Sequence, residues 1–130
     1  MTAENRKVNI KEELSRADAA YKAALLLFEG GFLSDAVSRI YYFLLYNVRA
    51  LLLTKGLEPR SHEAALRLLS LHFVKNGPLP TDISHLFSKV MKYREEADYN
   101  PSYQFTPNEV ELLLQEADSF AAALKKHINA

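Results

Sequence analysis

Hydrophobic residues recur every three or four positions along most of the chain, which is the spacing of one face of an α-helix. All four glycines and all five prolines lie in four short patches, at residues 30–31, 56–59, 77–80 and 101–107. The five stretches between these patches are rich in residues with good helix propensity, and the alternating pattern of strands is absent. Because short connections favour antiparallel neighbours, the pattern predicts an all-α, four- to five-helix up-and-down bundle. We expect one domain over residues 1–130, with an ordered core from about 8 to 128.

Several helix ends carry specific signals. Thr106 is followed by a proline and then by Glu109, the arrangement of a capped helix start. The fourth helix should begin with a capping hydroxyl from Thr81 and end near Tyr99, because Asn100 precedes a proline. The glycines at 30–31 and at 56 are expected to stop helices in the left-handed conformation.

The segment 40–53 is unusually apolar, because twelve of its fourteen residues are hydrophobic or tyrosine. Such a helix lies either at the centre of a bundle or against a second subunit. An α-helix turns by about 100° per residue, so the polar residues and tyrosines in and just before this segment fall on one narrow stripe of the helix. The stripe contains Asp35, Arg39, Tyr42, Tyr46 and Arg49. The stripe is either a solvated face with an Asp35–Arg39 pair, or a subunit interface or anion-binding surface, where arginine and tyrosine are favoured.

Composition and charge limit the classes of function. Sixteen basic residues balance sixteen acidic ones, so there is no overall positive field to recruit DNA, and we expect no DNA partner. The absence of cysteine removes disulfides, thiol nucleophiles and cysteine zinc sites. The N-terminus is charged, and the apolar run at 40–48 is much shorter than the roughly 18–20 residues of a membrane span. We therefore expect a soluble, cytoplasmic protein that does not enter a membrane.

Candidate chemistry is sparse. The four histidines have no metal-ligand spacing and no glycine-rich phosphate loop occurs, so we expect neither a metal nor a cofactor. His62 lies at the expected start of the third helix, where it serves either local packing or a site. Arg94 and Asp98 are four residues apart on one helix face, and form either a structural ion pair or part of a functional cluster.

A succession of short motifs, in a specific order and spacing, relates the chain to a known family. These are the segments 38–42, 48–52, 55–58, 61–62, 73–75 and 94–99. Over residues 10 to 125 the chain resembles the HEPN superfamily, in particular its small stand-alone bacterial and archaeal members. The resemblance implies a helical bundle that forms a homodimer and is encoded beside a minimal nucleotidyltransferase, often as a toxin–antitoxin pair. It also implies an Arg-x4–6-His motif that cleaves RNA without metal in active members.

The chain departs from this motif at its histidine. After Arg94, the three allowed histidine positions hold Tyr99, asparagine and proline. Arginine can hold a phosphate, but a tyrosine with an ordinary pKa near 10 is a poor base at neutral pH. The sequence thus favours a binding module that engages a nucleotidyltransferase partner, a nucleotide or RNA without cutting it.

Two alternatives stay open. In a metal-independent ribonuclease, Arg94 would bind phosphate while Tyr99, His62 or Asp98 moved the proton. In a plain helical scaffold, the bundle would only bind proteins. Arg94 and Tyr99 are accordingly the catalytic candidates, and the ligand or interface candidates are Arg39, Tyr42, Tyr46, Arg49, His62 and Asp98. We expect dimerisation through the second helix and the end of the fourth.

Overall fold

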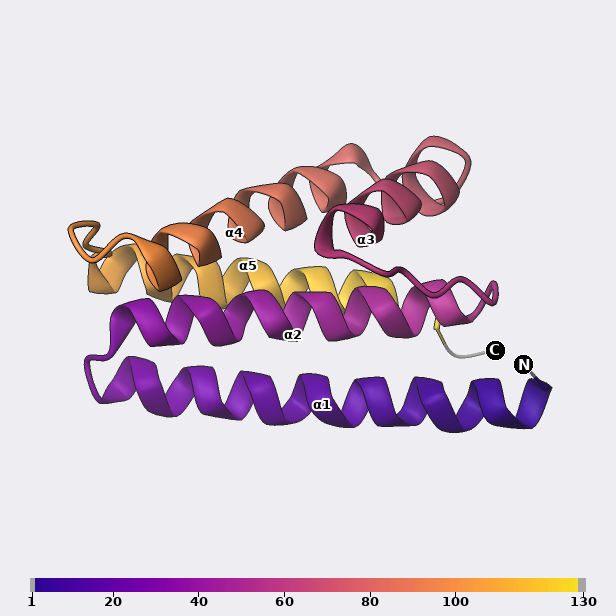
Figure 1. Ribbon diagram of the computed structural model, residues 1–130, viewed down its shortest axis with the longest axis horizontal. Coiled ribbons are helices and arrows are strands. Elements are labelled where there is room, and N and C mark those ends of the chain that lie inside the picture. Colours follow the sequence, from indigo (N-terminus) through magenta and orange to yellow (C-terminus); the bar gives the residue numbers. More distant parts are fainter. Residues whose placement is uncertain (1, 129–130) are drawn as a thin grey trace.

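Five α-helices and one π-helical turn make up the computed structural model, which describes residues 2–128 (Figure 1). In chain order they are α1 (Ala3–Glu29), α2 (Leu33–Leu53), α3 (His62–Leu69), the π-helical η1 (Ser70–Lys75), α4 (Thr81–Tyr99) and α5 (Pro107–Lys125). No strand occurs within these described residues, which confirms the predicted all-α class. None of the helices described there is both long and apolar enough to cross a membrane.

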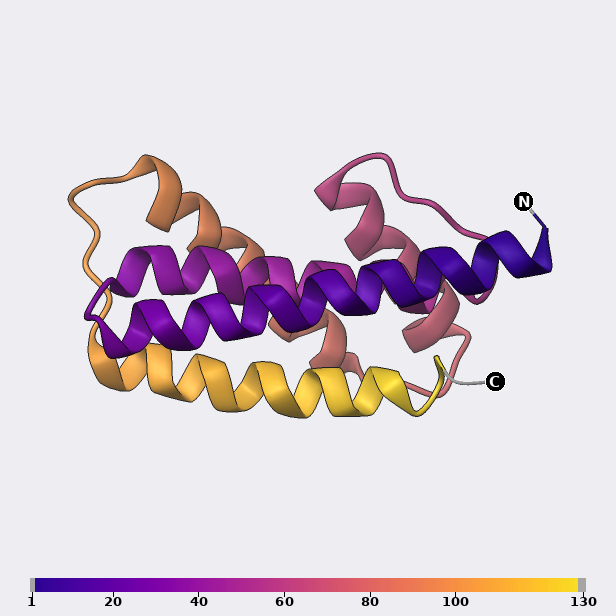
Figure 2. The same cartoon turned by 90° about the horizontal axis from the view of Figure 1, so that it is seen from below.

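The long helices run up and down beside one another. The helices α1, α2 and α5 lie side by side along the longest axis, while α4 is inclined and shares its side of α2 with the short α3 (Figures 1 and 2). Helix α2 packs against all four of the other helices, whereas α1 packs almost entirely on α2. The predicted antiparallel bundle is therefore confirmed, with α2 at its centre.

The central place of α2 accounts for its apolar character. Tyr41, Ile40, Leu44 and Leu51 are completely shielded from solvent, so the helix is buried on nearly every side. Its one fully buried amide, Asn47, donates from Nδ2 to the Phe43 carbonyl one turn earlier at 2.8 Å. A local bond of this kind allows a polar side chain to occupy an otherwise apolar helix.

Most of the predicted helix ends are confirmed. The backbone N–H of Glu109 donates to the Thr106 hydroxyl at 3.2 Å, and the N–H of Thr106 donates back to the Glu109 carboxylate at 3.3 Å. Helix α4 ends at Tyr99 as expected. Gly31 and Gly56 have φ of 84° and 71°, the left-handed conformation that glycine alone adopts easily.

Two predictions at helix ends are wrong. Gly30 has a right-handed φ of −79°, so only the second glycine of that pair is left-handed. Thr81 does not cap α4, because the helix already begins there and Pro80, at φ −74° and ψ 162°, occupies the capping position without a side-chain bond. Proline has the extended angles that a cap requires but no hydroxyl to accept a backbone N–H.

Candidate functional site

The guanidinium of Arg94, near the end of α4, is held against the centre of α2. Its Cζ lies 5.3 Å from the centre of the Tyr41 ring, and its Nη1 donates to Asp98 at 3.1 Å. Only 13% of the Arg94 side chain is exposed. Its Nε is buried and has no hydrogen-bond partner among the described residues. A fixed cation with one unmet donor is unusual in a folded protein and marks this place as a candidate site.

Arg94 stays charged in this setting. Burial by itself lowers the pKa of Arg94, but a hydrogen bond to Tyr99 and the nearby Tyr42 and Asp98 outweigh it, so the pKa is raised. The structure thus brings together the two catalytic candidates, Arg94 and Tyr99. The predicted pairing of Arg94 with Asp98 is confirmed as well.

His62 reaches the same place from the first residue of α3. The Ser61 hydroxyl caps this helix by accepting from the Ala64 N–H at 3.0 Å, which fixes the start of the helix at His62. Its Nδ1 lies 2.6 Å from the Tyr41 hydroxyl, and the two rings are nearly parallel with centres 5.3 Å apart. Burial raises the pKa of Tyr41 far above its usual value, so this hydroxyl remains protonated. It can therefore donate to His62 whenever the imidazole is neutral.

The imidazole itself is biased towards the neutral form. Burial lowers the pKa of His62 most, and the positive charge of Arg94 lowers it further. Glu63 opposes them with a smaller effect than that of Arg94, while Arg49 lowers the pKa and Glu95 raises it by still smaller amounts. With Tyr41 donating to Nδ1, the neutral ring carries its proton on Nε2. We call Tyr41, His62, Arg94, Asp98 and Tyr99 the Arg94 cluster. It combines a permanent cation with a titratable imidazole, the two groups that phosphate chemistry uses most often.

The polar stripe of α2 adjoins this cluster. The Tyr42 ring is 6.3 Å from the His62 ring and 6.0 Å from the Tyr46 ring, measured between centres. Arg39 lies over the Tyr42 ring at 4.7 Å, and no ion pair between Arg39 and Asp35 forms. The Asp35–Arg39 pair is therefore a wrong prediction, since the face of Tyr42 attracts the guanidinium instead.

Arg49, at the far end of the stripe, has a different partner. Its Nε lies 3.1 Å from Glu13 on α1, and Glu13 also binds Arg16 at 3.1 Å. Glu13 is only 6% exposed, although its position in a charged sequence gave no sign of burial. Two arginines compensate the buried carboxylate. This contact between Arg49 and the buried Glu13 was not predicted from the sequence.

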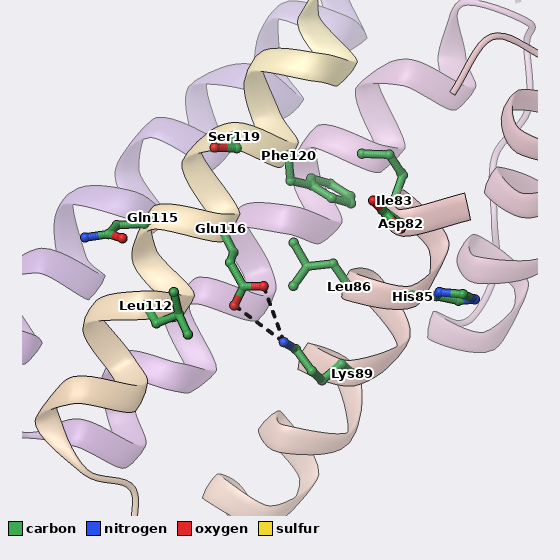
Figure 3. Close-up of a pocket in the computed structure, with 10 residues that line it drawn as sticks. All are labelled: Asp82, Ile83, His85, Leu86, Lys89, Leu112, Gln115, Glu116, Ser119 and Phe120. Carbon is green, nitrogen blue, oxygen red and sulfur yellow. Dashed lines mark hydrogen bonds and ion pairs between the residues drawn. The ribbon is translucent and has the colours of Figure 1, made fainter. Parts of the chain in front are cut away.

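A larger cavity lies away from the Arg94 cluster. A groove of about 530 Å³ opens between α4 and α5, where apolar side chains such as Leu86, Leu112 and Phe120 lie among polar and charged ones (Figure 3). An ion pair from Lys89 to Glu116 at 3.4 Å crosses it. None of its lining residues belongs to the Arg94 cluster, so the groove is separate from the candidate site. Within residues 2–128, no group of three metal-binding side chains is placed to hold an ion.

Sequence comparison decides the family. The model of the HEPN domain matches residues 10–127 of the chain. The chain belongs to the HEPN domain family. This confirms the resemblance drawn from the motifs at 38–62 and 94–99.

Small prokaryotic proteins are among the relatives. The Methanocaldococcus jannaschii protein named "Putative toxin MJ0142" is 31% identical over 122 residues, covering 94% of this chain and 83% of the relative. "Putative toxin MJ0605" of the same organism is 34% identical, covering 91% and 90% of the two chains. A Thermotoga maritima "UPF0332 protein" is 34% identical over 113 residues, covering 87% and 86%.

Proposed function

We propose that this HEPN protein binds a phosphate group of a nucleotide-containing ligand at the Arg94 cluster. The observation that carries the proposal is the Arg94 guanidinium, which is held by Asp98 and the Tyr41 ring while its buried Nε has no partner within residues 2–128. Arginine presents its donors in a planar fork that matches phosphate oxygens. The Nε2–H of a neutral His62 would supply a further donor beside it.

We also propose that the module works as a homodimer with a nucleotidyltransferase-type partner. The contiguous Arg39, Tyr42 and Tyr46 side chains support a subunit contact, because they are half-exposed and of the types enriched at interfaces. The family resemblance supports the partner class. A toxin–antitoxin pair would fit the toxin names of the two archaeal relatives.

One observation favours a second candidate function, metal-independent cleavage of RNA. The linear motif lacks its histidine after Arg94, yet His62 reaches the Arg94 cluster from another helix. The Tyr41 hydroxyl can donate to or accept from Nδ1, so His62 can take up and release a proton at Nε2. In this candidate Arg94 holds the phosphate and His62 takes the place of the missing motif histidine.

An RNA binding and cleavage assay in the presence of a chelator tests both candidates. Wild-type protein, Arg94→Ala and His62→Gln are compared, and circular dichroism verifies that each variant is folded. Binding that weakens with Arg94→Ala, without cleavage in any sample, supports the binding module. Cleavage that both substitutions abolish would establish the ribonuclease instead. If folded Arg94→Ala binds RNA and nucleotides as well as the wild type does, the Arg94 cluster is only structural and the proposal fails.

A further inference from the structure

A second, smaller cavity lies beside His62. It has a volume of about 180 Å³ and is lined by Leu45, Arg49, Pro59, Arg60, Ser61 and His62. The segment between α2 and α3 forms one wall, because it turns Arg60 and Ser61 back towards Arg49 on α2. Its described lining contains two guanidinium groups, a hydroxyl and an imidazole, but no carboxylate. That composition suits an anion.

Both arginines of this cavity are accessible to a ligand. Arg49 uses Nε for its 3.1 Å contact with the buried Glu13, which fixes the side chain. Arg60 is exposed and forms no ion pair within residues 2–128. The Arg49 side chain is 42% exposed, so a ligand can reach it from solvent.

The cavity and the Arg94 cluster share His62. Arg94 and Arg49 both lower the pKa of this imidazole, so each lies within electrostatic reach of it, although one is on α4 and the other on α2. The Tyr42 ring lies 6.3 Å from the His62 ring, measured between centres, and aromatic side chains of this kind stack unpaired bases. His62 lines the cavity with Arg49 and Arg60, and Tyr41 contacts both His62 and Arg94, so the two cationic positions adjoin the same imidazole.

We propose that the Arg49–Arg60 cavity binds a second phosphate of single-stranded RNA whose neighbouring phosphate lies at Arg94. This inference rests on the proposed function, since it takes Arg94 as the first phosphate site. It extends that function by naming the ligand as an RNA chain rather than a mononucleotide. It also adds Arg60 and Ser61 to the site, neither of which was among the candidate site residues of the sequence.

Fluorescence anisotropy with a labelled 2′-O-methyl uridine decamer tests the inference, because this probe resists cleavage through its 2′-oxygen. We expect Arg60→Gln to weaken binding about tenfold, the effect of losing a charge-assisted hydrogen bond. The slope of log affinity against log salt should fall by about 0.7, the value for one phosphate contact with a single strand. Arg67→Gln is the matched control, because Arg67 is exposed on α3, carries the same charge and does not line the cavity.

Uridine monophosphate separates the two positions. Its affinity should fall with Arg94→Gln and stay unchanged with Arg60→Gln, because a single phosphate occupies the Arg94 position. Thermal melts verify that each variant is folded before its affinity is compared.

The outcomes distinguish failure of the inference from failure of the proposed function. Equal decamer affinities for Arg60→Gln and Arg67→Gln would overturn the second phosphate site, while a loss with Arg94→Gln alone would leave the proposed function standing. A loss with Arg60→Gln but none with folded Arg94→Gln would overturn the proposed function and the two-phosphate arrangement together. A wild-type protein that binds neither probe would overturn both.

Discussion

His62 owes its environment to residues far from it in the chain. Tyr41 lies 21 positions earlier and binds its Nδ1, while Arg94 lies 32 positions later and opposes its protonation. The fold therefore favours a neutral imidazole where an unfolded chain would titrate near pH 6.5. This difference links the stability of the protein to pH.

The sign of that link follows from the lowered pKa. Because the unfolded chain takes up a proton on His62 before the folded one does, the free energy of unfolding should fall as pH drops below about 6.5, and the loss is complete once pH has passed below the folded-state pKa. Urea unfolding between pH 8 and pH 5 measures it. His62→Asn should remove this part of the pH dependence, whereas His85→Asn, at an exposed position, should keep it. Parallel curves for wild type and His62→Asn would contradict the assignment.

The candidate site was predictable only where its residues are close in sequence. Arg94 and Asp98 were paired correctly because a separation of four places two side chains on one helix face. The approach of His62 to Arg94 had no such signal, since it depends on how α3 and α4 pack on α2. Tyr41 was hidden for a related reason. The apolar spacing around Tyr41 predicts a core residue, and a core position does not predict that its hydroxyl bonds to a histidine.

At the scale of helices, the central position of α2 predicts large effects of core substitutions. Leu44 is fully buried at the middle of this helix. Leu44→Ala should lower the free energy of unfolding by about 3 kcal/mol, through lost burial and the cavity left behind. Leu112→Ala removes the same atoms from a side chain on α5 that is 56% exposed. This variant should change the free energy of unfolding by less than about 0.5 kcal/mol. Chemical denaturation measures both, and equal effects would contradict the central role of α2.

The two threonines at helix starts make a matched pair. Thr106→Ala removes a hydroxyl that accepts the Glu109 N–H, and should destabilise the protein by about 1 kcal/mol. Thr81→Ala removes a hydroxyl that makes no capping bond, so it should destabilise the protein by only a few tenths of a kcal/mol. Thermal unfolding followed by circular dichroism compares the two variants. A larger loss for Thr81→Ala would restore the cap that the sequence suggested.

The helices themselves were largely predictable, because the breakers and the apolar spacing are local signals. The capping box at Thr106 and the end of α4 at Tyr99 were found in this way. The third helix shows the limit of such signals. It begins as expected at His62 but changes to π-helical turns from Ser70 to Lys75, where Ser70 and Ser84 bond at 2.8 Å across to α4. The hydrophobic spacing gave no sign of this change, because the same apolar residues fit either winding.

At the scale of the whole molecule, one exposed surface joins the α2 stripe to the end of α4. Arg39, Tyr42 and Tyr46 are only partly buried, and Tyr99 is 76% exposed although it is a large aromatic residue. Tyr42 and Tyr99 both influence the pKa of Arg94, so both lie near that guanidinium. Tyrosine and arginine in contiguous, half-exposed positions are typical of residues that contribute most to subunit contacts.

We therefore expect the protein to be a dimer when its mass is measured by light scattering at micromolar concentration. Tyr46→Glu should shift the mass towards the monomer, because it places an unpaired charge in an interface that excludes water. Leu112→Glu is the control, since it charges an exposed apolar residue in the groove between α4 and α5 and should leave the dimer intact. If Leu112→Glu dissociates the dimer and Tyr46→Glu does not, the interface lies at the groove between α4 and α5 and not at the α2 stripe. A monomeric wild type would remove the dimer, and with it any role for a second subunit at the Arg94 cluster.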